Sequence, residues 1–167
     1  MIEPEELLKF LKERRSIRSY LNKEIPDKEV EMILEAGRWA PSTHNFQPWE
    51  FIVIKNKEIL KEISKKAAYG RHIRRAPLAI AIVGKINENP YLHIQDTSLV
   101  SMNMMLMAWA LGIGTSWIGA LERDDVKVML GLGENENLLT ILPLGYIKGN
   151  IPPSTPRKSL NEISREV

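Results

Sequence analysis

Arginine side chains and a serine hydroxyl lie close together near the start of the chain, in the segment Arg14-Arg15-Ser16-Ile17-Arg18. A guanidinium presents a fork of donors that matches the oxygens of a phosphate, and it stays charged at any working pH. The cations follow a predicted helix, so they could instead form a solvated helix end that offsets the helix dipole, which is the more common origin of such a cluster. The segment therefore indicates either an anion site or a basic helix end.

A second polar stretch runs from Ala40 to Trp49 and reads A-P-S-T-H-N-F-Q-P-W. Its two prolines, Pro41 and Pro48, fix the path of the loop between them. The serine, threonine, asparagine and glutamine side chains of this loop offer hydrogen-bond donors and acceptors without charge. Such a set of groups suits the polar edge of a planar heterocycle, and an ordinary turn is the alternative.

Two further patterns carry less information on their own. The basic pair Arg157-Lys158 follows Pro156 near the C-terminal end, where such pairs are usually solvated. Gly119 interrupts the apolar run Trp117–Ala120, and a glycine in such a run often marks a close approach of the backbone to another group. Neither pattern indicates a binding site on its own, and each is informative only in combination with the segments 14–18 and 40–49.

The sequence excludes several kinds of catalytic site. It contains no cysteine, which excludes thiolate ligands, cysteine nucleophiles and disulfide scaffolds. The histidines His44, His72 and His93 are far apart and show no metal-ligand spacing, so we expect no metal site. The Gly-x-Gly pairs at 112–114 and 131–133 lack the third small residue of a dinucleotide-binding fingerprint, and the sequence has no phosphate-binding P-loop.

The length and composition are those of an ordinary globular protein. The 167 residues suit one domain, which we expect to span 1–167 and to end in an extended C-terminal arm over 150–167. The formal net charge is 23 minus 21, or +2, which gives no reason to expect nucleic acid as a partner. The most apolar stretch, 99–111, is too short to span a bilayer, and the first fifteen residues do not resemble a signal peptide. We therefore expect a cytoplasmic protein without a membrane partner.

Hydrophobic periodicity predicts a mixture of helices and strands. The predicted helices are 4–15, 27–40 (with Asp27 as its cap), 57–68, 91–111 and 124–130, and the predicted strands are 49–54, 77–83, 115–118 and 139–147. The almost wholly apolar run 77–83 suits a strand covered on both faces. The arm after the last strand has little of its own to pack on, so it should lie on a second subunit. The methionines of 102–107 are expected to pack in the core of that dimer.

Taken together, these features resemble the nitroreductase-like flavoprotein family. The match follows the family's order across nearly the whole chain, with R-R-S-I-R, A-P-S-T-H-N-F-Q-P-W, an apolar helix opened near Asp96, W-I-G-A, L-P-L-G-Y and P-R-K-S-L. Six motifs in one order are a specific signal. The resemblance implies an α+β fold with a mixed central sheet flanked by helices. It also implies an FMN-binding homodimer whose C-terminal arms are exchanged and whose cofactor sites lie at the subunit interface.

The resemblance further implies roles for individual residues. Arg14 and Ser16 look like ligands of the FMN phosphate, Arg18 looks like the cation near the N1 and O2 edge of the flavin, and Gly119 resembles the glycine whose backbone approaches flavin N5. The segment 71–75 falls where relatives often place a further contact, and which of its five residues supplies that contact stays open. The implied cofactor-binding residues are Arg14, Arg15, Ser16, Arg18, Pro41, Ser42, Thr43, Asn45, Gln47, Arg74, Ile118, Gly119, Arg157 and Lys158.

Two other segments complete the implied site. The loop 41–45 looks like the part that reaches the flavin from the other subunit, and Arg157 and Lys158 look like tail cations that close on the phosphate. Because the flavin itself performs the chemistry, no catalytic protein residue is expected, and Arg18 and Gly119 would tune the flavin.

The implied activity is that of an oxidoreductase. Hydride would pass from NADH or NADPH through flavin N5 to a small-molecule electron acceptor, such as a nitroaromatic or a quinone, in a ping-pong cycle. Two alternatives stay open. One is a specialised flavin enzyme of the same fold, reductive dehalogenase-like or flavin-destructase-like, and the other is a non-catalytic flavin-binding dimer.

Overall fold

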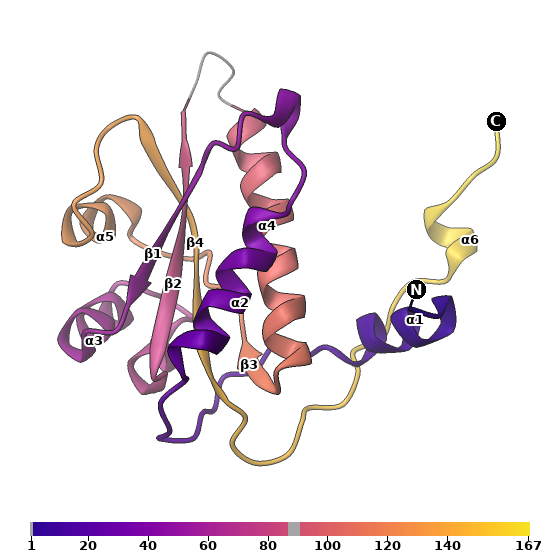
Figure 1. Cartoon of the computed structure of the whole chain (residues 1–167), viewed down its shortest axis with the longest axis horizontal. Helices are drawn as coiled ribbons and strands as arrows, with labels where there is room; N and C mark the ends of the chain where they lie inside the picture. The colour runs from indigo at the N-terminus through magenta and orange to yellow at the C-terminus, as the bar shows by residue number, and fades with distance from the viewer. Residues whose placement is uncertain (1, 87–90) are drawn as a thin grey trace.

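The computed structural model describes residues 2–86 and 91–167 (Figure 1). The elements, in which η marks a 3₁₀ helix, are α1 (Pro4–Glu13), α2 (Asp27–Arg38), η1 (Thr43–Asn45), β1 (Trp49–Ile54), α3 (Lys57–Lys65), η2 (Arg71–Arg75), β2 (Leu78–Lys85), α4 (Leu92–Ala110), β3 (Ile113–Thr115), α5 (Arg123–Met129), β4 (Glu136–Tyr146) and α6 (Leu160–Ile163). Helices and strands mix along the chain, as the periodicity predicts.

The four strands form one antiparallel sheet in the order β1-β2-β4-β3. In its register, Phe51 of β1 lies opposite Ile82 of β2. A bridge between Ser16 and Thr115 adds the chain before α2 to the β3 edge, and it is the one parallel pairing within residues 2–86 and 91–167. The predicted α+β class is confirmed, and the mixed character of the sheet comes from this bridge.

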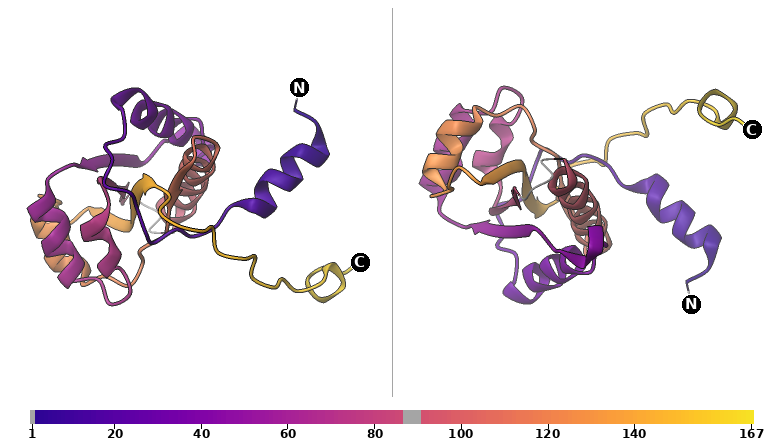
Figure 2. Two further views of the ribbon diagram at one scale, coloured as in Figure 1. Left: turned by 90° about the horizontal axis from the view of Figure 1, so that it is seen from below. Right: turned by 90° about the horizontal axis from the view of Figure 1, so that it is seen from above.

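Strand β2 separates two hydrophobic layers. Ile80 and Ile82 share a core with α2 and α4 on one face of the sheet, and Ala79 and Ala81 share a core with α3 and α5 on the other (Figures 1 and 2). All four side chains are fully buried, because successive residues of a strand point to opposite faces and both faces are covered. The apolar run 77–83 predicted this arrangement.

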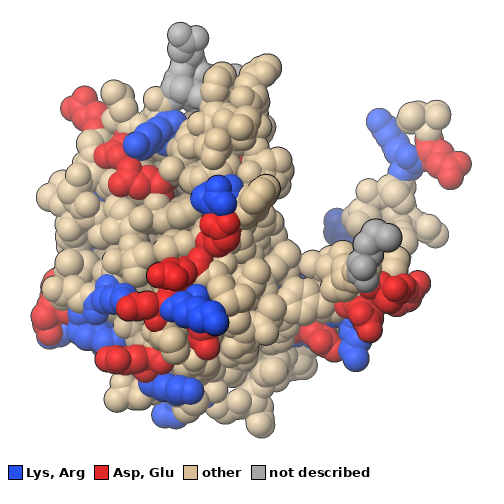
Figure 3. Space-filling view, viewed as in Figure 1, with Lys and Arg blue, Asp and Glu red and all other residues tan. Residues whose placement is uncertain are grey.

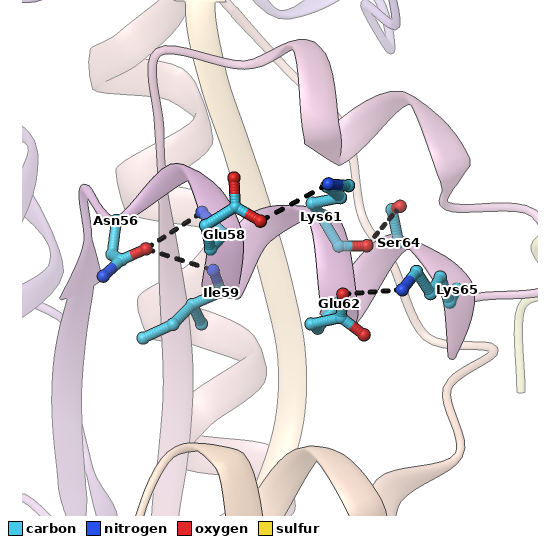
Figure 4. Close-up of polar contacts among 7 residues, drawn as sticks. All are labelled: Asn56, Glu58, Ile59, Lys61, Glu62, Ser64 and Lys65. Atoms are coloured by element: carbon cyan, nitrogen blue, oxygen red, sulfur yellow. Dashed lines mark hydrogen bonds and ion pairs between the residues drawn. The ribbon is translucent and has the colours of Figure 1, made fainter.

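Helix α3 is fixed by its first residues and by its inner face (Figure 4). The side-chain oxygen of Asn56 accepts hydrogen bonds from the backbone N–H groups of Glu58 and Ile59 at 2.9 and 3.2 Å, which caps the helix. Leu60 is fully buried beneath it. On the solvent side, Lys61 lies 3.4 Å from Glu58 in an exposed ion pair, a kind of contact that contributes little to stability.

Two segments project from the same side of the body, the helix α1 and the arm 150–167 (Figures 1 and 2). Every residue of the arm is exposed. The apolar face of α1 is exposed as well, by 41% at Leu7, 51% at Leu8 and 41% at Leu11. An amphipathic helix gains stability when its apolar face is covered, so both segments have the character of parts that pack on another surface.

The arm contains one element that the sequence prediction did not include. Residues Leu160–Ile163 form the short helix α6, although the arm was expected to be extended throughout. The cause is a capping box, in which the side chain of Ser159 and that of Glu162 each bond to the other's backbone.

Most predicted element bounds differ from the observed ones by one to three residues, and two differences have a clear structural description. The strand expected at 115–118 ends at Thr115, and Ile118 pairs with Ile141 of β4 in an isolated bridge. Helix α2 has Pro26 as its N-cap, and Asp27 is the first helical residue. The carboxylate of Asp27 instead pairs with Lys55 at 2.6 Å, which explains its place at the helix start without a capping bond.

The methionines of α4 do not form one surface. Met104 and Met105 are 0% and 6% exposed and pack in the chain's own core with Ile33, so their predicted place in a dimer core is wrong. Met102 is 43% exposed on the outer side of the helix. Consecutive helical positions point in different directions, so a cluster of four methionines cannot all lie on one face.

Among the described residues, none of the helices has the length and apolar character that a membrane-spanning helix requires.

Candidate functional site

Three arginines, Arg14, Arg15 and Arg157, line one cavity of about 980 Å³ between α1 and the start of the arm. Nη1 of Arg15 donates to the backbone oxygens of Lys12 and Arg14 at 2.5 and 2.8 Å. Nη1 of Arg157 donates to Oγ1 of Thr155 at 2.5 Å. In the described part of the chain none of the three arginines takes part in an ion pair, although Glu5 and Glu13 also line the cavity.

Arg14 is the most constrained of these cations. Its Nη1 is buried and has no hydrogen-bond partner among residues 2–86 and 91–167. Burial, followed by the nearby charges of Arg15 and Arg157, lowers the pKa of Arg14. A buried charged donor without an acceptor is unfavourable, so an anion that supplies both charge and acceptor oxygens would stabilise the cluster. A phosphate group fits this requirement because its oxygens match the guanidinium fork.

The segment that carries Ser16 and Arg18 is held against the edge of the sheet. The N–H of Ile17 donates to the backbone oxygen of Thr115 at 2.8 Å. Gly114 permits this approach, because a Cβ at that position would lie only 2.6 Å from the Cβ of Ile17. Ile17 is buried, whereas Arg18 is exposed, as expected for successive residues of an extended chain. The close contact between Gly114 and Ile17 thus fixes the positions of Ser16 and Arg18, two of the predicted cofactor ligands.

Arg18 shares its surroundings with three groups from other parts of the fold. Nε2 of His72 lies 2.8 Å from Oγ of Ser116, and the rings of His72 and Tyr20 are 6.4 Å apart. Burial and the charge of Arg18 lower the pKa of His72. Burial raises the pKa of Tyr20. At neutral pH a fixed cation therefore stands beside a neutral imidazole and a neutral phenol, which suits a planar ring that gains negative charge.

Gly119 and Ile118 follow Ser116 in the next turn of chain. Ile118 is 3% exposed, and its backbone N–H and oxygen both pair with Ile141. Gly119 is half-buried, and a Cβ added there would lie 3.1 Å from Nε1 of Trp117. The side chain of Ile118 thus packs in the core, and the absence of a side chain at Gly119 leaves room for the indole of Trp117.

The loop 41–47 has an unusual backbone. His44, Asn45 and Gln47 have φ values of 48°, 59° and 49°, in the left-handed region that residues other than glycine rarely adopt. Oγ of Ser42 accepts a hydrogen bond from the N–H of Gln47 at 3.0 Å and closes the loop. Strained conformations of this kind persist where the surroundings enforce them, and they cluster at binding sites.

Asp96 anchors this loop to helix α4. Its carboxylate is 4% exposed and accepts the backbone N–H of Thr43 at 3.2 Å from Oδ1 and 3.4 Å from Oδ2. The side-chain Oγ1 of Thr43 lies 3.5 Å from the same carboxylate. One buried acidic side chain thus sets the position of a loop that is distant from it in the sequence.

We expect Asp96→Ala to lower the free energy of unfolding by about 1–3 kcal/mol, because it leaves the N–H of Thr43 without its acceptor. Asp96→Asn keeps an oxygen at that position and should recover most of the loss. Urea denaturation of the wild type and the two variants measures the differences. Equal stability of Asp96→Ala and the wild type would show that this carboxylate does not hold the loop.

The predicted site residues fall into two groups at opposite ends of α4. The loop 41–47 is tied to Asp96 in the second turn of the helix, whereas Arg14, Arg18 and Gly119 lie near β3, which begins shortly after the helix ends. From Asp96 to its last residue, Ala110, the helix rises by about 21 Å. The two groups thus lie apart along this helix within one chain.

Two of the predicted cations are less defined than the others. Arg74 and Lys158 are exposed, and within the described residues the side chain of neither forms a hydrogen bond or an ion pair. The sequence analysis did not single out His72 and Ser116, which the structure places beside Arg18. His72 lies within the segment 71–75, which the resemblance singled out as a place for a further cofactor contact. Only the fold shows which of its five residues lies beside Arg18.

Comparison with known proteins identifies the family to which the chain is related. The nitroreductase family model matches residues 11–70 and 64–146. A protein of Archaeoglobus fulgidus, named as a proposed NADH dehydrogenase/NAD(P)H nitroreductase, is 38% identical over 151 residues, which cover 86% of this chain and 87% of that protein. A protein of Methanothermobacter thermautotrophicus with the same name is 33% identical over 147 residues, covering 84% and 77%.

The fold leads to the same family. The solved structure of an FMN-dependent nitroreductase from Clostridium difficile R20291 matches with a TM-score of 0.86 and 28% identity, covering 96% of this chain and 98% of that chain. Sequence, family model and fold agree over most of the chain, and the predicted fold is confirmed. The chain belongs to the nitroreductase family.

Proposed function

We propose that the chain folds as one FMN-binding domain over residues 1–167 and works as a homodimeric, NAD(P)H-dependent oxidoreductase. The observation that carries the proposal is the buried Nη1 of Arg14, which has no hydrogen-bond partner among the described residues and lies in a cluster of three guanidinium groups. The phosphate of FMN would supply the missing charge and acceptors. The names of the two archaeal relatives and of the FMN-dependent neighbour support the same assignment.

The phosphate end of the site would be formed by Arg14, Arg15, Ser16, Arg157 and Lys158. Arg14 supplies the buried donor, and Arg15 is held beside it by its bonds to the backbone. The two cations of the arm extend from the exposed segment, so they can close over a ligand that is already in place. This arrangement would bind a phosphate through charge-assisted hydrogen bonds on more than one side.

The ring end would be formed by Arg18, Gly119 and His72. Of the segment 71–75, His72 rather than Arg74 has the placement that favours a ring contact, because it lies beside Arg18. Bound FMN would accept a hydride from a reduced nicotinamide and pass two electrons to an acceptor. Arg18 would stabilise the negative charge that collects at the N1 and O2 edge, and Gly119 would leave the N5 side open to the backbone.

A second subunit would complete the site. The exposed side of α4 carries Ile94, Leu99 and Met102, which are 41%, 47% and 43% exposed, and residues 97–110 contain no charged side chain (Figure 3). Two copies of this helix packed antiparallel about a two-fold axis would bring the first turns of one beside the last turns of the other. The loop 41–47 of one subunit would then reach the arginine end of its partner.

In this arrangement the polar side chains of the loop, those of Ser42, Thr43, Asn45 and Gln47, would meet the flavin together with Pro41. The exposed helix α1 and the arm 150–167 would lie on the partner, the arms being exchanged between subunits. Both would bury the apolar surface that one chain leaves open.

The activity is tested by turnover of the FMN-loaded protein. It should oxidise NADH or NADPH steadily in the presence of a quinone or a nitroaromatic compound, and FMN-free protein should not. A halogenated phenol in the acceptor panel tests the dehalogenase-like alternative. Tight FMN binding without turnover on any acceptor would favour a non-catalytic flavin-binding dimer.

We expect Arg18→Ala to make the midpoint potential of the bound flavin more negative by about 20–40 mV, if the cation stabilises the reduced ring by about 1–2 kcal/mol. Binding of the oxidised, uncharged ring should change less. Arg18→Lys keeps the charge and should restore most of the potential. Redox titration of the wild type and the two variants measures the midpoint potentials. An unchanged potential in Arg18→Ala would show that Arg18 does not lie at the ring edge.

A further inference from the structure

The segment Tyr69–Arg75 presents an exposed aromatic ring and exposed arginines that the site described above does not use. Tyr69 is 87% exposed, and Arg71, Arg74 and Arg75 are exposed as well. Within residues 2–86 and 91–167 none of the three arginines forms an ion pair or a side-chain hydrogen bond. Their charges are therefore available to a ligand.

The short helix that carries these arginines also carries His72 of the proposed ring end. Arg71–Arg75 form the 3₁₀ helix η2, in which residues three apart lie on the same side. Ile73 and Ala76 are fully buried and face the core. Arg75 thus shares a side with His72, whose ring reaches Ser116 next to Arg18, and Arg71 shares a side with Arg74.

The phosphate of FMN does not account for this cluster. FMN carries one phosphate, and the partly buried Arg14 and Arg15 together with the exposed Arg157 have the character that such a phosphate requires. A nitroaromatic or a quinone is uncharged and needs no cluster of guanidinium groups. The remaining participant in the proposed reaction is the nicotinamide donor. NADH and NADPH share an anionic pyrophosphate, and only NADPH adds a terminal 2′-phosphate, with a charge of about −1.5 to −2 at pH 7, which suits a cluster of three guanidinium groups best.

We propose that Tyr69, Arg71, Arg74 and Arg75 bind the adenosine 2′-phosphate end of NADPH, so that the enzyme prefers NADPH to NADH. The inference rests on the proposed function, since it assigns the donor for the same site. Guanidinium groups recognise phosphate through paired hydrogen bonds, and an exposed tyrosine ring offers a face on which adenine can stack. The nicotinamide end would then lie toward Arg18 and His72.

Binding of adenosine 2′,5′-bisphosphate and of adenosine 5′-monophosphate to the FMN-loaded protein tests the assignment by calorimetry. The bisphosphate should bind about tenfold to a hundredfold more tightly, because it adds the charged contacts of the 2′-phosphate. Arg74→Gln/Arg75→Gln should abolish the difference. The matched variant Lys61→Gln/Lys65→Gln removes the same charge from the neighbouring helix α3 and should leave the difference intact.

Flavin reduction separates this inference from the proposed function. In the wild type, NADPH should reduce the bound flavin with an apparent affinity about tenfold or more above that of NADH, and the double arginine variant should bring the two donors level. Equal affinities in the wild type, or a preference that survives the variant, would overturn the NADPH assignment while the oxidoreductase stands. Failure of both donors to reduce the flavin would overturn the proposed function as well.

Discussion

Replacing Arg14 by alanine is expected to weaken FMN binding about tenfold to a hundredfold and to leave riboflavin binding nearly unchanged. The reason is the buried Nη1 of Arg14, which has no partner among the described residues and would donate to the cofactor phosphate. A charged hydrogen bond of this kind contributes about 1.5–3 kcal/mol. Riboflavin lacks the phosphate, so it cannot lose the contact. Fluorescence titration of both flavins against both proteins measures the difference.

Lys61→Ala provides the control for Arg14→Ala. It removes the same charge from an exposed ion pair on α3, which lies in the body of the protein away from α1 and the arm (Figures 1 and 4). The control variant should bind FMN as the wild type does. If Arg14→Ala weakens riboflavin as much as FMN, the arginine acts on the fold or on the ring, and the phosphate assignment is wrong.

Mixing two defective variants is expected to restore FMN binding to about a quarter of the sites. Arg14→Glu should destroy the phosphate end, and Thr43→Trp should destroy the loop that the buried Asp96 anchors. If each site takes one end from each subunit, a mixed dimer has one doubly altered site and one intact site. Random pairing makes about half of the dimers mixed, and hence leaves about a quarter of all sites intact.

The measurement requires unfolding and refolding the two variants together and counting bound FMN by its absorbance. Refolding each variant alone supplies the control and should give almost no binding. If the mixture also binds almost no FMN although mixed dimers form, both ends of a site belong to one chain. In that case the antiparallel arrangement of α4 would be wrong.

The central elements of the fold were predictable because their signals are local. The apolar run 77–83 suits a strand covered on both faces and lies largely within β2, and β1 has the predicted bounds Trp49–Ile54. The methionines of α4 show the limit of this reasoning. Their spacing predicts burial, but whether Met104 packs in its own chain or against a partner depends on which helix crosses it, and that is α2.

The candidate site was predictable in residue type and only partly in geometry. A buried donor such as that of Arg14 is invisible in the sequence, where a basic helix end was the more common explanation. The cluster of Arg18, His72 and Ser116 joins three distant segments, so no local pattern could select His72 from its neighbours. The same holds for the contact of Asp96 with Thr43, which spans 53 positions along the chain.

The claim that FMN is held between two subunits is tested most directly by sedimentation of the FMN-loaded protein, followed at a wavelength that only the flavin absorbs. The flavin signal should sediment solely with the dimer, at one flavin per chain, and the chromophore released on unfolding should be FMN. A protein that binds no FMN on titration, or a folded monomer that carries FMN at micromolar concentration, would contradict the account.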